Sequence, residues 1–358
     1  MGEKCQILLE RPKVGFYRAG KPVVGTVKYF LDKPTEFTSI ILSLVGEGKC
    51  YWTEASSHVN TCYCGDEEYV FQRKKILETE DSTSKIQETG VYEHQFNFIL
   101  PEYIPSSYSD KHSIISYRII VHFKKGSLSR RDNKYGTQIP VYSNSISNSP
   151  VSLTFGLEKR LLSLISRQTV RLKAEIEKMF LFAGENIKLK ISVNNDSVVP
   201  ITSIKTELIK DFTYVSNIKH ERTVVKPVTG TARDSIKIKK RSVSNICCIV
   251  PTLPHLHSIQ YSKIIIGEYK VKVTVKLPFP FRNVSVEVPV VIRMQDETVT
   301  VEAKEDDQLL NIYYSKSIKK TCFNRVLDDT HGQGKSFFIC FCYNYTHNYC
   351  PKNRSQYF

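Results

Sequence analysis

The sequence predicts an all-β protein made of two antiparallel β-sandwiches in tandem, the second an internal duplicate of the first. Short apolar runs alternate with polar residues at period two, Pro and Gly mark the turns, and no long segment keeps a helical period. A stretch of two strands and their turn, residues 16–44, also returns at residues 180–208 with one constant offset. Because a single offset holds through a turn, a loop and a second strand, we interpret it as a structural repeat.

Residues 1–146 are predicted to form the first sandwich. A short apolar run at residues 7–9 ends at Arg11-Pro12, which is typical of an edge strand. Further strands are expected at 23–30, 40–44, 69–76, 85–88, 92–100, 115–123 and 139–141. The clearest of these alternate so that one face meets a core. The rest of the polar segment 53–90 is expected to be loop.

Residues 169–296 are predicted to form the second sandwich, after a linker at 147–168 that begins in a Ser/Asn-rich segment. Its strands repeat the order of the first half, and three later rows, 246–250, 269–275 and 288–290, match 96–100, 117–123 and 139–141. From about residue 297 the pattern gives way to charged and then Cys- and aromatic-rich residues. We therefore expect residues 297–358 to form a disordered tail.

Composition indicates a protein of about two domains, because 358 residues exceed the usual size of a single core. No apolar run approaches the ~20 residues that a membrane span needs, and residues 1–13 lack the apolar region of a secretory signal. We therefore expect a cytoplasmic protein whose ten cysteines are mostly reduced. The net charge of +15 favours anionic partners, although it also serves solubility.

Catalytic and metal-binding patterns are scarce. The sequence has no GxSxG, P-loop or HExxH motif, and His255 and His257 fall in an expected loop between strands. We predict no enzyme activity, no cofactor and no metal site. The tail contains Cys340 and Cys342 beside apolar residues. Three interpretations stay open: S-acylation at these thiols, a zinc site completed by His347 and Cys350, and an unstructured tail without either.

Two basic runs are the candidate anion- or membrane-binding sites. The first comprises Lys124, Lys125, Arg130 and Arg131, and the second comprises Lys237, Lys239, Lys240 and Arg241. Phosphate or lipid headgroups are the expected ligands, since each lysine near an anionic membrane contributes roughly 1 kcal/mol. The simpler interpretation is a solvated strand face. Nucleic acid is not expected, because no recognition helix or RNP-type aromatic strand is present.

A set of motifs follows in one order through both halves. The first half carries AGKPVVGTV, SIILSLVGEG before Trp52, GVYEHQFNFILPEYIPSSY and ISYRIIVHF. The second half carries FAGENIKLKISVNNDS, NICCIVPTLP, GEYKVKVTVKLP and VEVPVVI. Over about residues 4–295 this order resembles the arrestin family, and within it the arrestin domain-containing proteins known as alpha-arrestins.

The resemblance implies arrestin-type sandwiches in a non-enzymatic adaptor or scaffold for membrane-protein trafficking, in endocytosis or endosomal sorting. It implies a cytoplasmic protein, peripheral at the plasma membrane and endosomes, that binds cytoplasmic tails of membrane proteins and meets anionic lipids. Many members recruit ubiquitin ligases through PPxY motifs in the tail. This sequence has no PPxY, so a link to a ubiquitin ligase would need another route.

A second class of function stays open, namely a secreted or cell-surface tandem sandwich that is held by disulfides and binds other molecules. The ten cysteines motivate it, as do glycosylation-like triplets at Asn195, Asn283 and Asn344. The two hypotheses differ in thiol state, because a cytoplasmic adaptor keeps most of its thiols free.

Overall fold

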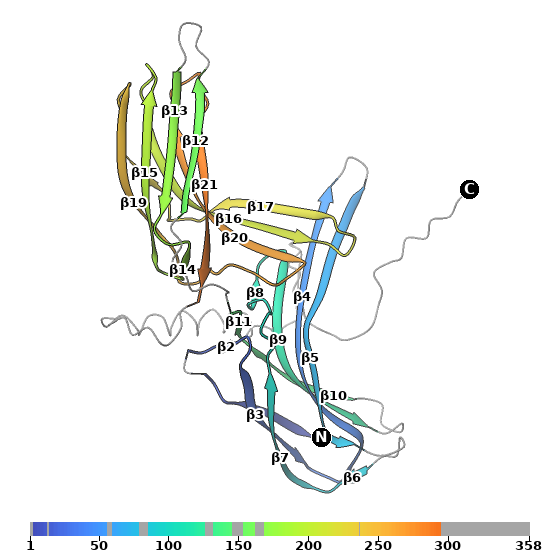
Figure 1. Cartoon of the computed structure of the whole chain (residues 1–358). Helices are drawn as coiled ribbons and strands as arrows, with labels where there is room; N and C mark the ends of the chain where they lie inside the picture. The colour runs from blue at the N-terminus through green and yellow to red at the C-terminus, as the bar shows by residue number, and fades with distance from the viewer. Residues whose placement is uncertain are drawn as a thin grey trace, which may run out of the picture. The chain divides into compact units, whose positions relative to one another are not determined.

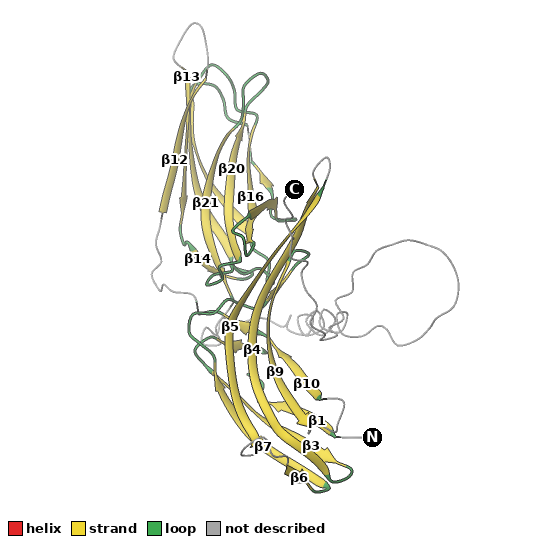
Figure 2. Ribbon diagram, turned by 90° about the vertical axis from the view of Figure 1, so that its right-hand side faces the viewer, coloured by secondary structure: helices red, strands yellow, loops and turns green. Residues whose placement is uncertain are grey.

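The computed structural model of the chain consists of strands and loops, with no helix in the residues that it describes (Figure 1, Figure 2). The described residues are 3–12, 14–55, 59–78, 85–125, 132–144, 153–161, 168–235 and 237–294. All of the strands lie within one compact unit, Met1–Val299. The predicted all-β class with two antiparallel sandwiches is confirmed.

The first sandwich packs a three-stranded sheet against a larger one. The smaller sheet has the order β1 (Lys4–Leu9), β3 (Pro22–Leu31), β7 (Gly90–Ile99). The larger has the order β10 (Asn133–Ile139), β9 (Ser113–Lys125), β4 (Thr35–Ala55), β5 (Asn60–Glu78), with β6 (Lys85–Gln87) on β4 and β8 (Tyr108–Ser109) on β9. The expected edge strand before Arg11-Pro12 is β1, which pairs only with β3 among the described strands.

The second sandwich repeats this plan (Figure 1). One sheet has the order β12 (Leu153–Leu161), β13 (Gln168–Ile176), β15 (Asn186–Asp196), β19 (Ser242–Pro251). The other has the order β14 (Phe180–Phe182), β21 (Val284–Arg293), β20 (Ile265–Lys276), β16 (Ser203–Val215), β17 (Glu221–Pro227), with β18 (Arg233–Asp234) on β16. Apart from β14, neighbouring strands in both sheets are antiparallel.

The repeat seen in the sequence has a structural counterpart. The short strand β2 (Tyr17–Arg18) pairs in parallel with β11 (Val141–Tyr142), and β14 pairs in parallel with β21. Each short strand is followed by a glycine with positive φ, Gly20 at 75° and Gly184 at 87°, a conformation that other residues rarely adopt. The alternating residues beyond these turns are buried, with Val23 and Ile187 fully inaccessible.

The expected loop in segment 53–90 is wrong over most of its length. β4 and β5 form one long hairpin, whose pairing runs from Ser39↔Glu78 out to Ala55↔Asn60. Its outer half is polar and therefore gave no alternating apolar signal. The hairpin gains contacts there from the second sandwich: Asp66 N–H donates to Asn217 Oδ1 at 3.1 Å.

The expected linker at 147–168 is shorter than the sequence indicated, because β12 occupies much of it. This strand pairs along its whole length with β13, from Leu153↔Ile176 to Leu161↔Gln168. It lies at a sheet edge and includes charged residues, which are typical of protected edges but weaken the apolar pattern. Pairing with a neighbouring strand thus decides the conformation where local sequence does not.

Asp110 lies at the centre of a polar cluster that joins the two sandwiches. Its carboxylate accepts hydrogen bonds from the hydroxyls of Tyr214 (2.5 Å) and Tyr108 (2.9 Å) and from His112 N–H (2.9 Å). Lys210 Nζ lies 3.6 Å from the same carboxylate. Tyr214 and Lys210 belong to β16, so a single carboxylate of the first sandwich holds the second sandwich through two side chains.

Candidate functional site

The second basic run lies at one end of the second sandwich, and its four predicted side chains are all exposed: Lys237, Lys239, Lys240 and Arg241. Three loops meet at this end, which we call the basic end: residues 197–202 between β15 and β16, 237–241 before β19, and 277–283 between β20 and β21. None of the four cations forms an ion pair with another residue that the structure describes.

Backbone hydrogen bonds fix two of these loops against each other. Ile201 and Ile238 exchange N–H···O bonds of 3.0 and 3.1 Å. Arg241 N–H donates to the carbonyl of Ser197 at 3.0 Å. The cations of residues 237–241 therefore project from a backbone that is held in place, and their charges stay concentrated at one end of the sandwich.

A buried asparagine organises the same loops from within. Asn195 is fully buried, and its Nδ2 donates to the carbonyls of Val199 (2.8 Å) and Lys239 (3.1 Å). Its Oδ1 accepts from Ser197 Oγ at 2.6 Å. In the sequence this residue begins a glycosylation-like triplet, but in the structure both hydrogens of its side-chain amide donate to backbone carbonyls. A glycan on its Nδ2 would require these buried hydrogen bonds to break.

We expect the substitution Asn195→Ala to lower the free energy of unfolding by about 3 kcal/mol, because it removes hydrogen bonds and leaves buried carbonyls without donors. Chemical denaturation of the purified protein measures the change. Asn194→Ala is the matched control, since Asn194 is the neighbouring residue and only half-buried. Equal losses in the two variants would contradict the role of Asn195.

Phe279 is the most exposed large apolar side chain at the basic end, with 98% of its surface accessible. It lies in the loop between β20 and β21, where Leu277 N–H donates to Asn283 Oδ1 at 3.0 Å and closes the loop at its base. Val198, in the loop after β15, is also exposed. Apolar side chains beside cations are typical of a surface that meets the boundary between lipid headgroups and acyl chains.

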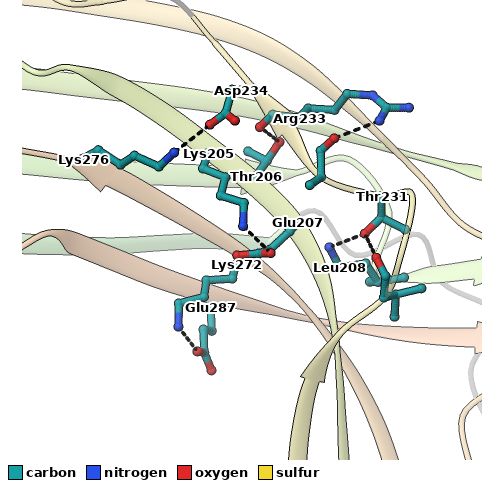
Figure 3. A network of polar contacts seen from close by, with 12 residues as sticks. Lys205, Thr206, Glu207, Leu208, Thr231, Arg233, Asp234, Lys272, Lys276 and Glu287 are labelled. Atoms are coloured by element: carbon teal, nitrogen blue, oxygen red, sulfur yellow. Dashed lines mark hydrogen bonds and ion pairs between the residues drawn. The ribbon is translucent and has the colours of Figure 1, made fainter.

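The strand face next to the basic end balances its own charges. Lys205 pairs with Glu207 at 2.7 Å, and Lys276 pairs with Asp234 at 3.2 Å (Figure 3). Lys272 likewise lies 3.6 Å from Glu287 on the adjacent strand. Such partly exposed pairs add little stability, but they neutralise this face of β16, β20 and β21. Next to these three strands, the cations without a described ion-pair partner therefore lie in the loops of the basic end.

The first basic run is only partly assembled as an anion site. Lys124 is exposed, whereas Lys125 Nζ lies 3.0 Å from the buried carboxylate of Glu3. Burial opposes ionisation of Glu3, but hydrogen bonds and the charge of Lys125 outweigh it and hold the pKa of Glu3 below its usual value. Arg130 and Arg131 lie outside the described residues. The described residues of the two basic runs belong to different sandwiches.

The other predicted features concern thiols, metals and membranes. Six cysteines are described, and none of them forms a disulfide with another described residue. Cys340 and Cys342 lie outside the described residues, so S-acylation there stays a prediction. The part of the chain that is described contains no cluster of three or more metal-type side chains, and no helix in it is both long and apolar enough to span a membrane.

Two residues of this site, Asn195 and Phe279, could not be recognised as part of a site from the sequence. The sequence around Asn195 shows only a glycosylation-like triplet. Its side chain binds backbone carbonyls of Val199 and of Lys239, which is distant in the chain, and residue types do not reveal such partners. Phe279 stands between Pro278 and Pro280, and this spacing was the available signal, since two prolines end a strand and push the residue between them into a turn.

Comparison with known proteins agrees with this architecture. Residues 5–145 match the family described as arrestin (or S-antigen), N-terminal domain, and residues 166–296 match its C-terminal domain. Arrestin domain-containing protein 5 of Bos taurus is 25% identical over 80% of this chain and 90% of its own length. Arrestin domain-containing protein B of Dictyostelium discoideum is 22% identical over 72% of this chain, which spans only 40% of that relative. The chain therefore belongs to the arrestin family, as an arrestin domain-containing protein of the alpha-arrestin-like type.

Proposed function

We propose that this protein is a cytoplasmic adaptor in membrane-protein trafficking, whose basic end contacts anionic lipids while other surfaces bind cytoplasmic tails of membrane proteins. Arrestin-family proteins are generally non-enzymatic adaptors that bind membrane-protein cargo, which supports the coarser part of the proposal. The finer part rests on one observation: four exposed cations, which form no ion pair with any residue that the structure describes, share an end of the sandwich with the exposed Phe279.

Attachment at the basic end would place the protein peripherally at the plasma membrane and endosomes, where endocytosis and endosomal sorting take place. Coulombic attraction brings the cations to an anionic surface, and salt weakens this attraction by screening the charges. Insertion of Phe279 buries apolar surface, and this contribution to binding is not screened by salt. A link between cargo and a ubiquitin ligase is part of the same proposal, by a contact other than PPxY.

Replacing Phe279 with serine tests the lipid contact. Burying a Phe side chain contributes about 1.5–3 kcal/mol, so binding to vesicles of phosphatidylcholine with added phosphatidylserine should weaken at least about tenfold. Co-sedimentation measures the binding, and vesicles of phosphatidylcholine alone should bind poorly. Ile218→Ser is the matched control, because Ile218 is also a highly exposed apolar residue but lies in a different loop.

Two results would contradict the proposal. One is an equal loss of vesicle binding in the Phe279 and Ile218 variants, which would indicate a general effect of surface polarity. The other is vesicle binding that does not change between low and high salt, since attraction between exposed charges weakens as the Debye length shortens.

A further inference from the structure

Strand β19 is a sheet edge without the usual protection against pairing. It is the last strand of its sheet, and no described strand pairs with its outer side. Its sequence, SVSNICCIVP, contains no Asp, Glu, Lys or Arg, unlike every other described strand of more than three residues. Charged residues on edge strands normally block the addition of another strand, so β19 is open to pairing in a way that β1, β12 and β17 are not.

The outward side chains of β19 are apolar apart from that of Asn245, and they are exposed. Val243, Cys247 and Ile249 are accessible, and Ile249 has 56% of its surface exposed. Side chains on an added strand would lie beside them on the same face of the sheet, where cross-strand apolar pairs stabilise the addition. Backbone hydrogen bonds would supply affinity, and these neighbours would supply selectivity for aliphatic residues.

A cavity of about 240 Å³ lies between β19 and the opposite sheet. Its lining includes Ile191, Ile204, Thr206, Ile246 and Cys248, with Arg233 of β18 also contributing. Thr206 Oγ1 and Cys248 Sγ contact each other at 3.1 Å, so part of its polar lining is already satisfied. On the same measure one water molecule needs only about 10–15 Å³, so the cavity has room for an aliphatic side chain.

The position of the cations predicts the direction in which an acidic peptide would run along β19. The four cations of the basic end immediately precede β19 in the chain, so they lie where its first residue, Ser242, begins. In an antiparallel arrangement the C-terminal end of an added strand would face them. Acidic residues that follow the aliphatic stretch of a ligand would therefore meet these unpaired cations, whereas acidic residues that precede it would lie near Pro251 at the far end of the strand.

We propose that β19 binds an extended segment of a partner protein as an added antiparallel strand, and that the segment alternates aliphatic residues and then ends in acidic ones. One of its inward side chains enters the cavity, and its acidic end meets the basic end. This inference deepens the proposed function, because it identifies an edge and a peptide chemistry for the binding of protein tails.

A labelled synthetic peptide of alternating Val and Thr followed by Glu and Asp tests the proposal with the full-length protein. We expect Ile249→Lys to weaken binding about tenfold, equivalent to about 1.4 kcal/mol, as measured by fluorescence anisotropy. Val225→Lys is the matched control and should leave affinity unchanged. Val225 is exposed to 57% on β17, which is also an edge strand. Thermal melts establish that both variants remain folded.

Hydrogen exchange locates the bound peptide. Amides of β19 should gain protection on binding, while those of β1 should not, and a peptide with its acidic residues placed first should bind more weakly.

Four results would overturn the inference. Three of them are protection of β1 instead of β19, an equal loss of peptide affinity in both Lys variants, and no binding of the peptide. The fourth is strong protection of β19 without peptide, which a second copy or another segment of this chain would give. Vesicle binding at the basic end is measured separately, so failure here leaves the lipid contact standing.

Discussion

Replacing Asp110 with alanine is expected to lower the free energy of unfolding by about 3 kcal/mol, since removing one partner of a partly buried charged pair leaves the others uncompensated. The carboxylate accepts bonds from Tyr214, Tyr108, His112 and both the N–H and Oγ of Ser113. Its loss would leave the Tyr214 hydroxyl without its acceptor and Lys210 without its carboxylate partner at the junction of the sandwiches, while the Tyr108 hydroxyl would still accept from Lys210. Chemical denaturation measures the change.

The ionisation of the Asp110 carboxylate makes the expected loss of stability depend on pH. Burial opposes ionisation of Asp110, but hydrogen bonds from Tyr214, His112 and Tyr108 and the charge of Lys210 outweigh it, so its pKa in the folded protein lies below the usual value. A lowered pKa stabilises the fold above the unfolded pKa of about 3.9, and this contribution is lost as the pH falls through the folded pKa. The difference between wild type and Asp110→Ala should therefore be full at neutral pH and shrink in acid.

Two controls separate the cluster from general charge effects. Tyr214→Phe removes one hydroxyl and should cost about 1 kcal/mol. Asp132→Ala removes an exposed carboxylate that pairs with His122, and it should change stability by less than about 1 kcal/mol. A loss in Asp132→Ala as large as that in Asp110→Ala, or a difference from wild type that stays constant into acid, would contradict the role of Asp110.

The fold was predictable where local pattern and tertiary structure agree. The strands at 23–30 and 115–123 alternate because one face of each packs into a core, and β3 and β9 bury Val27, Val121 and Phe123 completely. The pattern failed where a strand is held by its neighbours. The outer half of β5 is polar because much of it faces solvent, and β12 is a charged edge, so neither carries the apolar period that identifies a strand.

The candidate site was predictable in part. The cations of residues 237–241 are visible as a run, because charge is a property of composition along the chain. Their surroundings are not visible, because the carboxylates nearest in sequence, such as Asp234, are taken by lysines from another strand. Hydrophobicity favours burial of Phe279, and only its position between two prolines hints at exposure. Asp110 shows no sequence signal, since its partners on β16 are remote along the chain.

Replacing Lys237, Lys239, Lys240 and Arg241 together with glutamine is expected to weaken binding to phosphatidylserine vesicles about a thousandfold. Each cation near an anionic surface contributes about 1 kcal/mol, and four such contributions correspond to about three decades in the binding constant. The four side chains are exposed and make no ion pair with described residues, so the melting temperature should stay close to that of wild type. Co-sedimentation and a thermal melt measure the two quantities independently.

A variant with the same change of net charge shows whether the position of the cations matters. Lys33, Lys85, Lys111 and Lys173 are exposed lysines elsewhere on the chain, and replacing all four with glutamine serves as the control. If overall charge alone attracted the protein to membranes, the two variants would lose affinity equally, and the basic end would have no special role. If the basic end is the contact, only its variant loses affinity and most of the salt dependence, because the remaining attraction comes from Phe279, whose apolar burial salt does not screen.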